Sequence, residues 1–167
     1  MFKDEYDKVE APAIDQLTQL GWSYVNGAEL SPDHSNHERA YFRDVVLINR
    51  LESSIKRLNP WISNENLRKV TRELTHPNFA GLMEYNHAIY QTLVNYLSVE
   101  QDLGKGRKGQ TVKIIDFDNP DNNEFLCTNQ FKVEGVNQNI IPDIVCFVNG
   151  LPLAVIEAKS PYISSPM

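Results

Sequence analysis

The spacing of the hydrophobic residues changes from a helical period of about 3.6 to a period of two near residue 104, and this change most constrains the fold. Apolar residues recur at helical spacing before the Gly- and Lys-rich stretch Gly104–Gly109, and they alternate with polar residues after it. Helices that precede a late cluster of strands predict an α/β domain, with a mixed β-sheet flanked by α-helices and completed late in the chain.

Four helices are expected in the first part of the chain, over Glu10–Leu20, Tyr41–Leu58, Asn64–Leu74 and Ala80–Leu97. Pro12 suits a first helical turn, and Gly21 suits the residue that ends a helix. Asn59-Pro60 ends the second helix, and Ser63 is a candidate N-cap for the third. The apolar positions of the fourth helix fit a period of 3.6 and are interpreted as core.

Strands are expected at Trp22–Val25, Thr111–Phe117, Glu124–Glu134, Ile144–Val148 and Leu151–Lys159. Asn149-Gly150, between the last two, is a strong signal for a tight hairpin turn. A sheet of about four to five strands follows from this pattern.

Charge and composition exclude several classes of protein. Sixteen basic and twenty-two acidic side chains give a formal charge of −6, which disfavours a protein that holds nucleic acid by bulk charge alone. The two cysteines, Cys127 and Cys146, lack the spacing of a disulfide scaffold or zinc site and are expected to be buried thiols. The charged N-terminus and the lack of a long apolar run predict a cytoplasmic protein with no membrane contact.

The last two strands carry the residues with the clearest chemistry. Pro142-Asp143 precedes one strand, and Glu157-Ala158-Lys159 ends the other. Glu157 and Lys159 are two residues apart and share a face, and such charges beside an apolar strand are costly unless they have partners. Two carboxylates on adjacent strands predict a Mg²⁺ site, where a metal-bound water becomes a nucleophile and a lysine orients it or stabilises the transition state.

The parity of the hairpin tests this hypothesis. A strict two-residue turn pairs Val148 with Leu151, and therefore Asp143 with Ile156, so that Asp143 and Glu157 face opposite sides. A shared metal ion thus requires a three-residue loop, a bulge or a bend at Pro142 that shifts the pairing by one residue. We predict such a shift.

The order of these motifs resembles the PD-(D/E)xK nuclease core, and their surroundings resemble the N-terminal domain of the R subunit of type I restriction enzymes (HsdR). The matching phrases span nearly the whole chain: Val9-Glu10-Ala11-Pro12, Leu20-Gly21-Trp22, Tyr41-Phe42-Arg43-Asp44-Val45-Val46-Leu47, Leu58-Asn59-Pro60, Ile115-Asp116-Phe117, Asn119-Pro120, Asn129-Gln130-Phe131, Pro142-Asp143-Ile144-Val145, Val148-Asn149-Gly150-Leu151-Pro152-Leu153 and Glu157-Ala158-Lys159.

The resemblance implies a restriction-endonuclease-like fold and Mg²⁺-dependent endonucleolytic cleavage of double-stranded DNA. It assigns catalysis to Asp143, Glu157 and Lys159. It adds Glu10 on the first helix and the backbone carbonyl of Ala158 as metal ligands. The partners it implies are DNA and the modification and specificity subunits of a restriction complex, and ATP enters only through a translocase motor.

The chain also departs from this family pattern. It ends eight residues after Lys159, without the family's helix that carries a Gln-x-x-x-Tyr motif and without the motor. We therefore expect residues 1–167 to form a single nuclease-like domain truncated at its C-terminal end, and the isolated fragment need not be active.

Plainer interpretations stay open. Glu157 and Lys159 could be a surface charge pair, and Glu10 an acidic residue favoured at a helix N-terminus. The stretch Gly104–Gly109 fails as a Walker A motif, so Lys105, Arg107 and Lys108 are either a solvated turn or a DNA contact. For the whole chain, the alternatives are a non-catalytic assembly domain of a restriction complex and a PD-(D/E)xK nuclease of another pathway.

Overall fold

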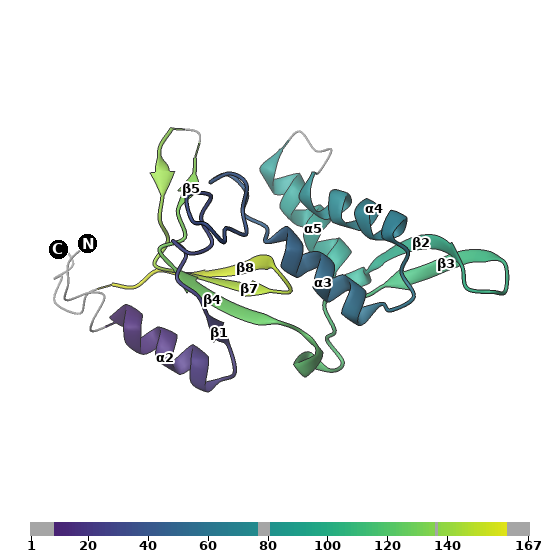
Figure 1. The fold of residues 1–167 in the computed structure, drawn as a ribbon, viewed down its shortest axis with the longest axis horizontal. Coiled ribbons are helices and arrows are strands. Elements are labelled where there is room, and N and C mark those ends of the chain that lie inside the picture. The colour runs from purple at the N-terminus through teal and green to yellow at the C-terminus, as the bar shows by residue number, and fades with distance from the viewer. Residues whose placement is uncertain (1–8, 77–80, 136, 160–167) are drawn as a thin grey trace. The chain divides into compact units, whose positions relative to one another are not determined.

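The computed structural model describes residues 9–76, 81–135 and 137–159, which form two compact units (Figure 1). The first unit contains residues 9–47 and 124–159, and the second contains residues 48–123. None of the helices in these described ranges is both long and apolar enough to cross a membrane.

The first unit contains a four-stranded mixed sheet, as predicted. Its strand order is β1-β4-β7-β8; β1 runs parallel to β4, and the other neighbours are antiparallel. The elements of this unit are the helix α2 (Ala11–Gln19) and the strands β1 (Ser23–Tyr24), β4 (Phe125–Asn129), β5 (Val133–Glu134), β6 (Asn139–Ile140), β7 (Ile144–Val148) and β8 (Leu151–Ile156). Strands β5 and β6 form a separate small hairpin.

The two faces of the sheet are covered differently. Helix α2 lies along one face of the sheet (Figure 1). Its Ile14 packs there against Cys127, Ile144 and Cys146. On the other face, the segment that follows β1 supplies Leu30 and Leu47, which pack with Leu126, Phe131, Val145 and Phe147. Successive side chains of β4 and β7 point to opposite faces of the sheet, and both faces are therefore apolar and buried. Both cysteines are buried and free, as expected.

The β7–β8 hairpin keeps the two-residue turn and still shifts its register. Asn149 and Gly150 have φ angles of 52° and 81°, the left-handed conformation of the favoured hairpin turn. Val148 pairs with Leu151 and Phe147 with Pro152, but Cys146 pairs with Ala154, so Leu153 is the extra residue of a β-bulge.

A helix over Tyr41–Leu47 is wrong, because α3 (Ile48–Leu58) begins only at Ile48. The amide of Tyr41 donates to Asp44 Oδ2 at 2.9 Å, and the amide of Asp44 donates to the carbonyl of Tyr41 at 3.0 Å. A side chain that bonds to nearby backbone stabilises a turn instead of a helix. Tyr41 is 57% exposed, so its apolar stripe does not mark a buried helical face.

Arg39 fixes this non-helical segment against the sheet. Its side chain is only 1% exposed, and it donates to the carbonyls of Leu30 and Lys132 at 3.4 and 3.0 Å. The guanidinium carbon lies 3.8 Å from the centre of the Phe131 ring. Burial lowers the pKa of Arg39. The residue therefore joins three segments through hydrogen bonds and a cation–π contact.

The second unit contains three helices and a two-stranded hairpin. Its elements are α3, α4 (Asn64–Thr75), α5 (Leu82–Asn95), β2 (Leu97–Asp102), β3 (Arg107–Val112) and the short 3₁₀ helix η2 (Pro120–Asn122). Leu51 and Ile55 of α3 and Val70 of α4 are fully buried. Ser63 caps α4 as predicted, because its hydroxyl accepts from the amide of Asn66 at 3.2 Å.

The sequence does not predict the β2–β3 hairpin. Helix α5 ends at Asn95, and Leu97 begins β2 instead of ending the helix. Strand β3 ends at Val112, so the predicted strand over Thr111–Phe117 is wrong for all but its first two residues.

Residues that follow β3 form a polar turn around Asp116. Its carboxylate accepts from Lys113 Nζ, the amide of Asn119 and Asn122 Nδ2, at 3.1, 3.2 and 2.9 Å. The Asn122 hydrogen bond is the largest of the causes that hold the pKa of Asp116 below its ordinary value, and the bond from Lys113 adds to it. These bonds replace the sheet ladder that the alternating sequence predicted.

The expected strand Glu124–Glu134 is interrupted at Gln130, whose φ of 54° ends β4. Such a left-handed residue cannot continue a regular ladder. The chain resumes an extended conformation in β5, which pairs with β6 outside the four-stranded sheet.

Candidate metal and catalytic site

The candidate site lies at the end of the sheet where β7 begins and β8 ends. Ile144 pairs with Ile156, so the bulge brings Asp143 opposite Glu157 when the register is continued by one residue. Residues that are paired across antiparallel strands share a face. The predicted shift of pairing is confirmed, and its cause is the extra residue Leu153.

A hydrogen bond ties Asp143 to the neighbouring chain segment. The backbone amide of Ala158 donates to Asp143 Oδ2 at 2.6 Å. Within the described residues, the second oxygen of Asp143 and both oxygens of Glu157 make no hydrogen bond or ion pair. Two carboxylates with unused oxygens therefore flank the backbone of Ala158.

Glu157 and Lys159 are exposed to solvent, and this differs from the sequence argument. From the sequence, two charges beside an apolar strand are expected to be costly unless they have partners. The cost is absent here because water solvates both side chains. Ala158, between them, is buried, so the alternation of these three residues is the one expected of an extended segment.

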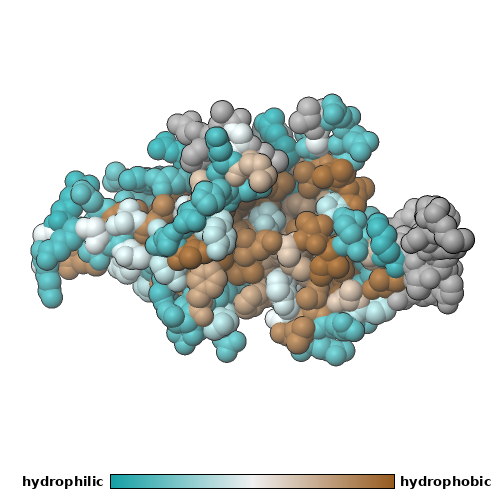
Figure 2. Space-filling view, turned by 180° about the vertical axis from the view of Figure 1, so that it is seen from behind, coloured by the Kyte–Doolittle hydropathy of each residue, from teal (hydrophilic) through white to brown (hydrophobic). Residues whose placement is uncertain are grey.

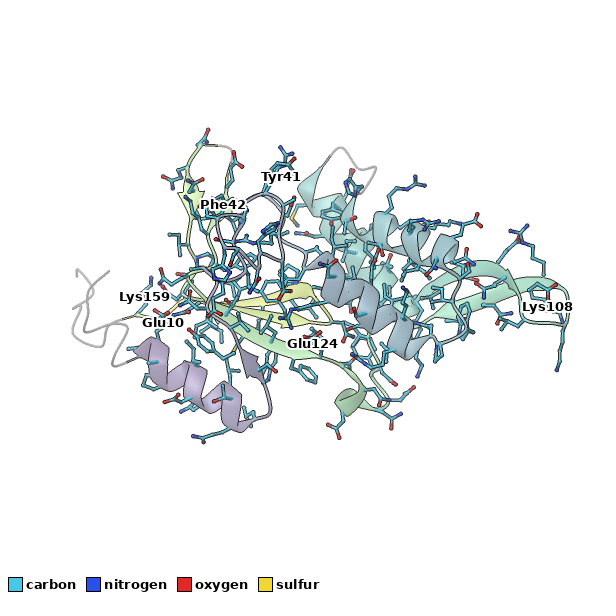
Figure 3. The ribbon with its side chains drawn as sticks, viewed as in Figure 1. Glu10, Tyr41, Phe42, Lys108, Glu124 and Lys159 are labelled. Carbon is cyan, nitrogen blue, oxygen red and sulfur yellow. The ribbon has the colours of Figure 1, made fainter. Side chains whose placement is uncertain are left out.

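Glu10 is placed at the N-terminal end of α2 and is only 1% exposed. Asn129, the last residue of β4, donates from Nδ2 to Glu10 Oε1 at 2.8 Å, and its Oδ1 accepts from the hydroxyl of Tyr24 at 2.7 Å. Figure 3 shows Glu10 and Lys159 at the same end of the four-stranded sheet. Asn129 thus fixes the carboxylate of Glu10 relative to the strands.

From the sequence alone, no functional role was assigned to Asn129. The available signal was its place within the phrase Asn129-Gln130-Phe131. Gly27 adds to the precision of this corner, because its amide donates to the carbonyl of Asn129 at 2.7 Å. A Cβ at Gly27 would lie 2.5 Å from that same oxygen, so only glycine fits here.

The donor atoms at this end of the sheet suit a hard cation. Mg²⁺ prefers oxygen ligands and commonly uses one or two carboxylates with several waters. Asp143 and Glu157 can supply the carboxylates, and the carbonyl of Ala158 can supply a third oxygen. In the described part of the chain, no three Asp, Glu, His or Cys side chains gather into one metal-binding group, so Glu10 is not brought together with the other two carboxylates.

The basic stretch is not the loop that the sequence predicted. Lys105 lies in the turn between β2 and β3, whereas Arg107 and Lys108 are the first residues of β3. Arg107 Nε lies 3.8 Å from Glu100 Oε2 in an exposed ion pair. Lys105 and Lys108 form no ion pair with any other described residue.

Comparisons with known proteins give the family. The chain is 40% identical over 156 residues to the MjaIXP endonuclease subunit of a type I restriction enzyme from Methanocaldococcus jannaschii, and 30% identical over 154 residues to the HindI endonuclease subunit from Haemophilus influenzae. Each alignment covers 92% of this chain and 15% of the relative, so the chain spans about a seventh of their length.

A family model described as "Type I restriction enzyme R protein N terminus" matches residues 2–166. The match covers both β7 and β8 and the first helix, which carry the candidate site. The chain therefore belongs to the family of the N-terminal region of the type I restriction enzyme R protein.

Proposed function

We propose that this chain is the endonuclease module of a type I restriction R subunit and hydrolyses phosphodiester bonds of double-stranded DNA with Mg²⁺. The observation that carries the proposal is the bulged register of β7 and β8, which places Asp143 opposite Glu157. The names of the relatives, which are endonuclease subunits of type I restriction enzymes, support it.

In this proposal, Asp143, Glu157 and the carbonyl of Ala158 hold the cation. When bound, Mg²⁺ lowers the pKa of a coordinated water and neutralises charge on the phosphodiester. The hydrogen bond from the amide of Ala158 to Asp143 Oδ2 fixes the orientation of the carboxylate, and the other oxygen is left to bind the cation. A ligand that is held before binding loses less conformational entropy.

Lys159 and Glu10 have different roles in the proposal. The exposed ammonium of Lys159 donates hydrogen bonds to phosphate oxygens and stabilises the negative charge that develops during hydrolysis. Glu10 is proposed to position the cation site indirectly, through Asn129 or through a metal-bound water, because its carboxylate is buried and already accepts a hydrogen bond from Asn129 Nδ2. Substitution of Glu10 should therefore weaken metal binding less than substitution of Asp143.

The remaining parts of the activity belong to the longer protein. We propose that double-stranded DNA is delivered by an ATP-driven motor outside this chain, and that the modification and specificity subunits are its partners. The length of the relatives, of which this chain covers 15%, leaves room for such a motor.

Calorimetric titration with Mn²⁺, a tighter-binding surrogate for Mg²⁺, tests the proposal. The 167-residue chain should bind the ion, and Asp143→Ala and Glu157→Ala should each abolish binding while urea unfolding shows that both variants are folded. Glu134→Ala is the matched control, because it removes an exposed carboxylate of the same unit on β5. Binding that survives in both site variants, or no binding by the parent chain, would favour a non-catalytic assembly domain.

A further inference from the structure

Charge is distributed unevenly between the two units. Residues 48–123 contain ten of the sixteen Lys and Arg residues and nine of the twenty-two Asp and Glu residues, which gives this unit a formal charge of +1. The rest of the chain contains six basic and thirteen acidic residues, a charge of −7. By its net charge, the unit with the candidate site repels a polyanion, so a local cluster of cations within residues 48–123 is the better candidate for attraction.

The outer face of α4 carries a cluster of cations within that second unit. Arg68, Lys69 and Arg72 are all exposed, and none of their side chains forms an ion pair or hydrogen bond with another described residue. With Glu65 and Asn66 they line a hollow of about 470 Å³. Three cations oppose one carboxylate there, so the hollow is electropositive.

The position of α4 is fixed by the β2–β3 hairpin. Gln101 Oε1 accepts from the amide of Ser63 and from Asn66 Nδ2, both at 2.9 Å, and Gln101 Nε2 donates to the carbonyl of Trp61. Lys108 pairs with Gln101 across the hairpin and projects from the same face. The hairpin therefore presents Lys108 on the side that meets the first turn of α4.

The surface of the hairpin is hydrophilic, as Figure 2 shows at its left side, and Figure 3 marks Lys108 near the hairpin end. Among the described residues, neither β2 nor β3 contains a large exposed apolar side chain, and the turn between them contains only Leu103. Such a surface suits a polar, charged ligand and does not suit an apolar partner.

We propose that Arg68, Lys69 and Arg72 of α4, together with Lys108, bind the phosphate backbone of double-stranded DNA. This inference rests on the proposed function and names the surface that contacts its substrate. Phosphate contacts carry no sequence information, which fits a module that cuts DNA supplied by other subunits. Each contact releases counterions from the duplex, so binding must weaken steeply with salt.

Anisotropy of a short fluorescein-labelled duplex in EDTA measures this binding without the metal site. The test variant is Arg68→Gln/Arg72→Gln, and the matched control is Arg43→Gln/Lys56→Gln, which removes two exposed cations elsewhere. We expect the slope of log K against log salt to become shallower by about 2 in the test variant, since each lost contact contributes about 0.9. The control should keep the parent slope.

The inference would be overturned if the parent chain did not bind DNA at the lowest salt. It would also be overturned if both double variants lost affinity equally, because bulk charge alone would then explain the binding. An unchanged test variant would also overturn it and would redirect the α4 cations to an acidic protein partner. The anisotropy assay contains EDTA, so its result does not depend on whether Asp143 and Glu157 bind Mn²⁺. Failure of the DNA-binding proposal can therefore be distinguished from failure of the metal-site proposal.

Discussion

Insertion of one alanine after Leu153 should separate the two carboxylates without unfolding the chain. The β-bulge already accommodates one extra residue, and a second one shifts the pairing again, so that Asp143 faces Ile156. Glu157 then moves by about 3.3 Å along the strand and projects from the opposite face. We expect the inserted variant to lose Mn²⁺ binding.

The cost in stability is small because β8 is poorly buried. Val155 is 56% exposed and Ile156 is 37% exposed, and the insertion makes them exchange faces. Full burial of such a side chain stabilises by about 1.5–3 kcal/mol, so loss of the buried fraction of Ile156 costs about 1–2 kcal/mol. Urea unfolding should therefore show a folded protein with a modestly lower free energy of unfolding.

Deletion of Leu153 is the matched control for the insertion. It removes the bulge and turns the hairpin into a regular one, in which Cys146 still pairs with Ala154 and Asp143 still faces Glu157. Calorimetry should give this variant the Mn²⁺ affinity of the parent. The reasoning is refuted if the inserted variant binds as the parent does, or if the deletion abolishes binding in a folded protein.

Three further predictions concern stability and reactivity. Arg39→Ala should lower the free energy of unfolding in urea by about 3 kcal/mol or more, because it removes a desolvated cation–π contact and hydrogen bonds to buried carbonyls. The control Arg43→Ala, at an exposed position, should change it by less than about 0.5 kcal/mol. The lowered pKa of Asp116 stabilises the folded protein at pH values above the ordinary pKa of 3.8, and this stabilisation is lost as the pH falls through the folded value. The urea midpoint should therefore fall less between neutral and acidic pH in Asp116→Asn than in the parent. An equal fall in both proteins would contradict this. Burial raises the pKa of the Cys127 and Cys146 thiols, so neither should react with Ellman's reagent at neutral pH until urea unfolds the chain.

Local signals predicted the elements whose determinants lie within a few residues. Ser63 caps α4, and Asn149-Gly150 turns the β7–β8 hairpin, because each depends on one side chain or one backbone conformation. The segment Tyr41–Leu47 failed for the opposite reason. Besides the local hydrogen bonds between Tyr41 and Asp44, its conformation depends on Arg39, which reaches the carbonyl of Lys132 across 93 residues of sequence.

The candidate site was predicted in part because its chemistry imposes a geometric requirement. A regular two-residue hairpin places Asp143 and Glu157 on opposite faces of the sheet. Only the requirement for a shared cation predicted a shift of the pairing, and it did not locate the extra residue at Leu153. The link between Asn129 and Glu10 could not be predicted, since it joins residues 119 positions apart. Nor does sequence spacing reveal that Glu157 and Lys159 are solvated, because exposure depends on what covers β8.

Strand β8 is an edge strand among the described residues, and edge strands invite pairing with another molecule. Two features described above limit this. Pro152 has no backbone N–H to donate, and the bulge at Leu153 breaks the regular spacing of the outer hydrogen-bonding groups. Only the short run from Ala154 to Ile156 stays available for an intermolecular ladder. The same extra residue that aligns the two carboxylates thus also protects the chain against edge-to-edge aggregation.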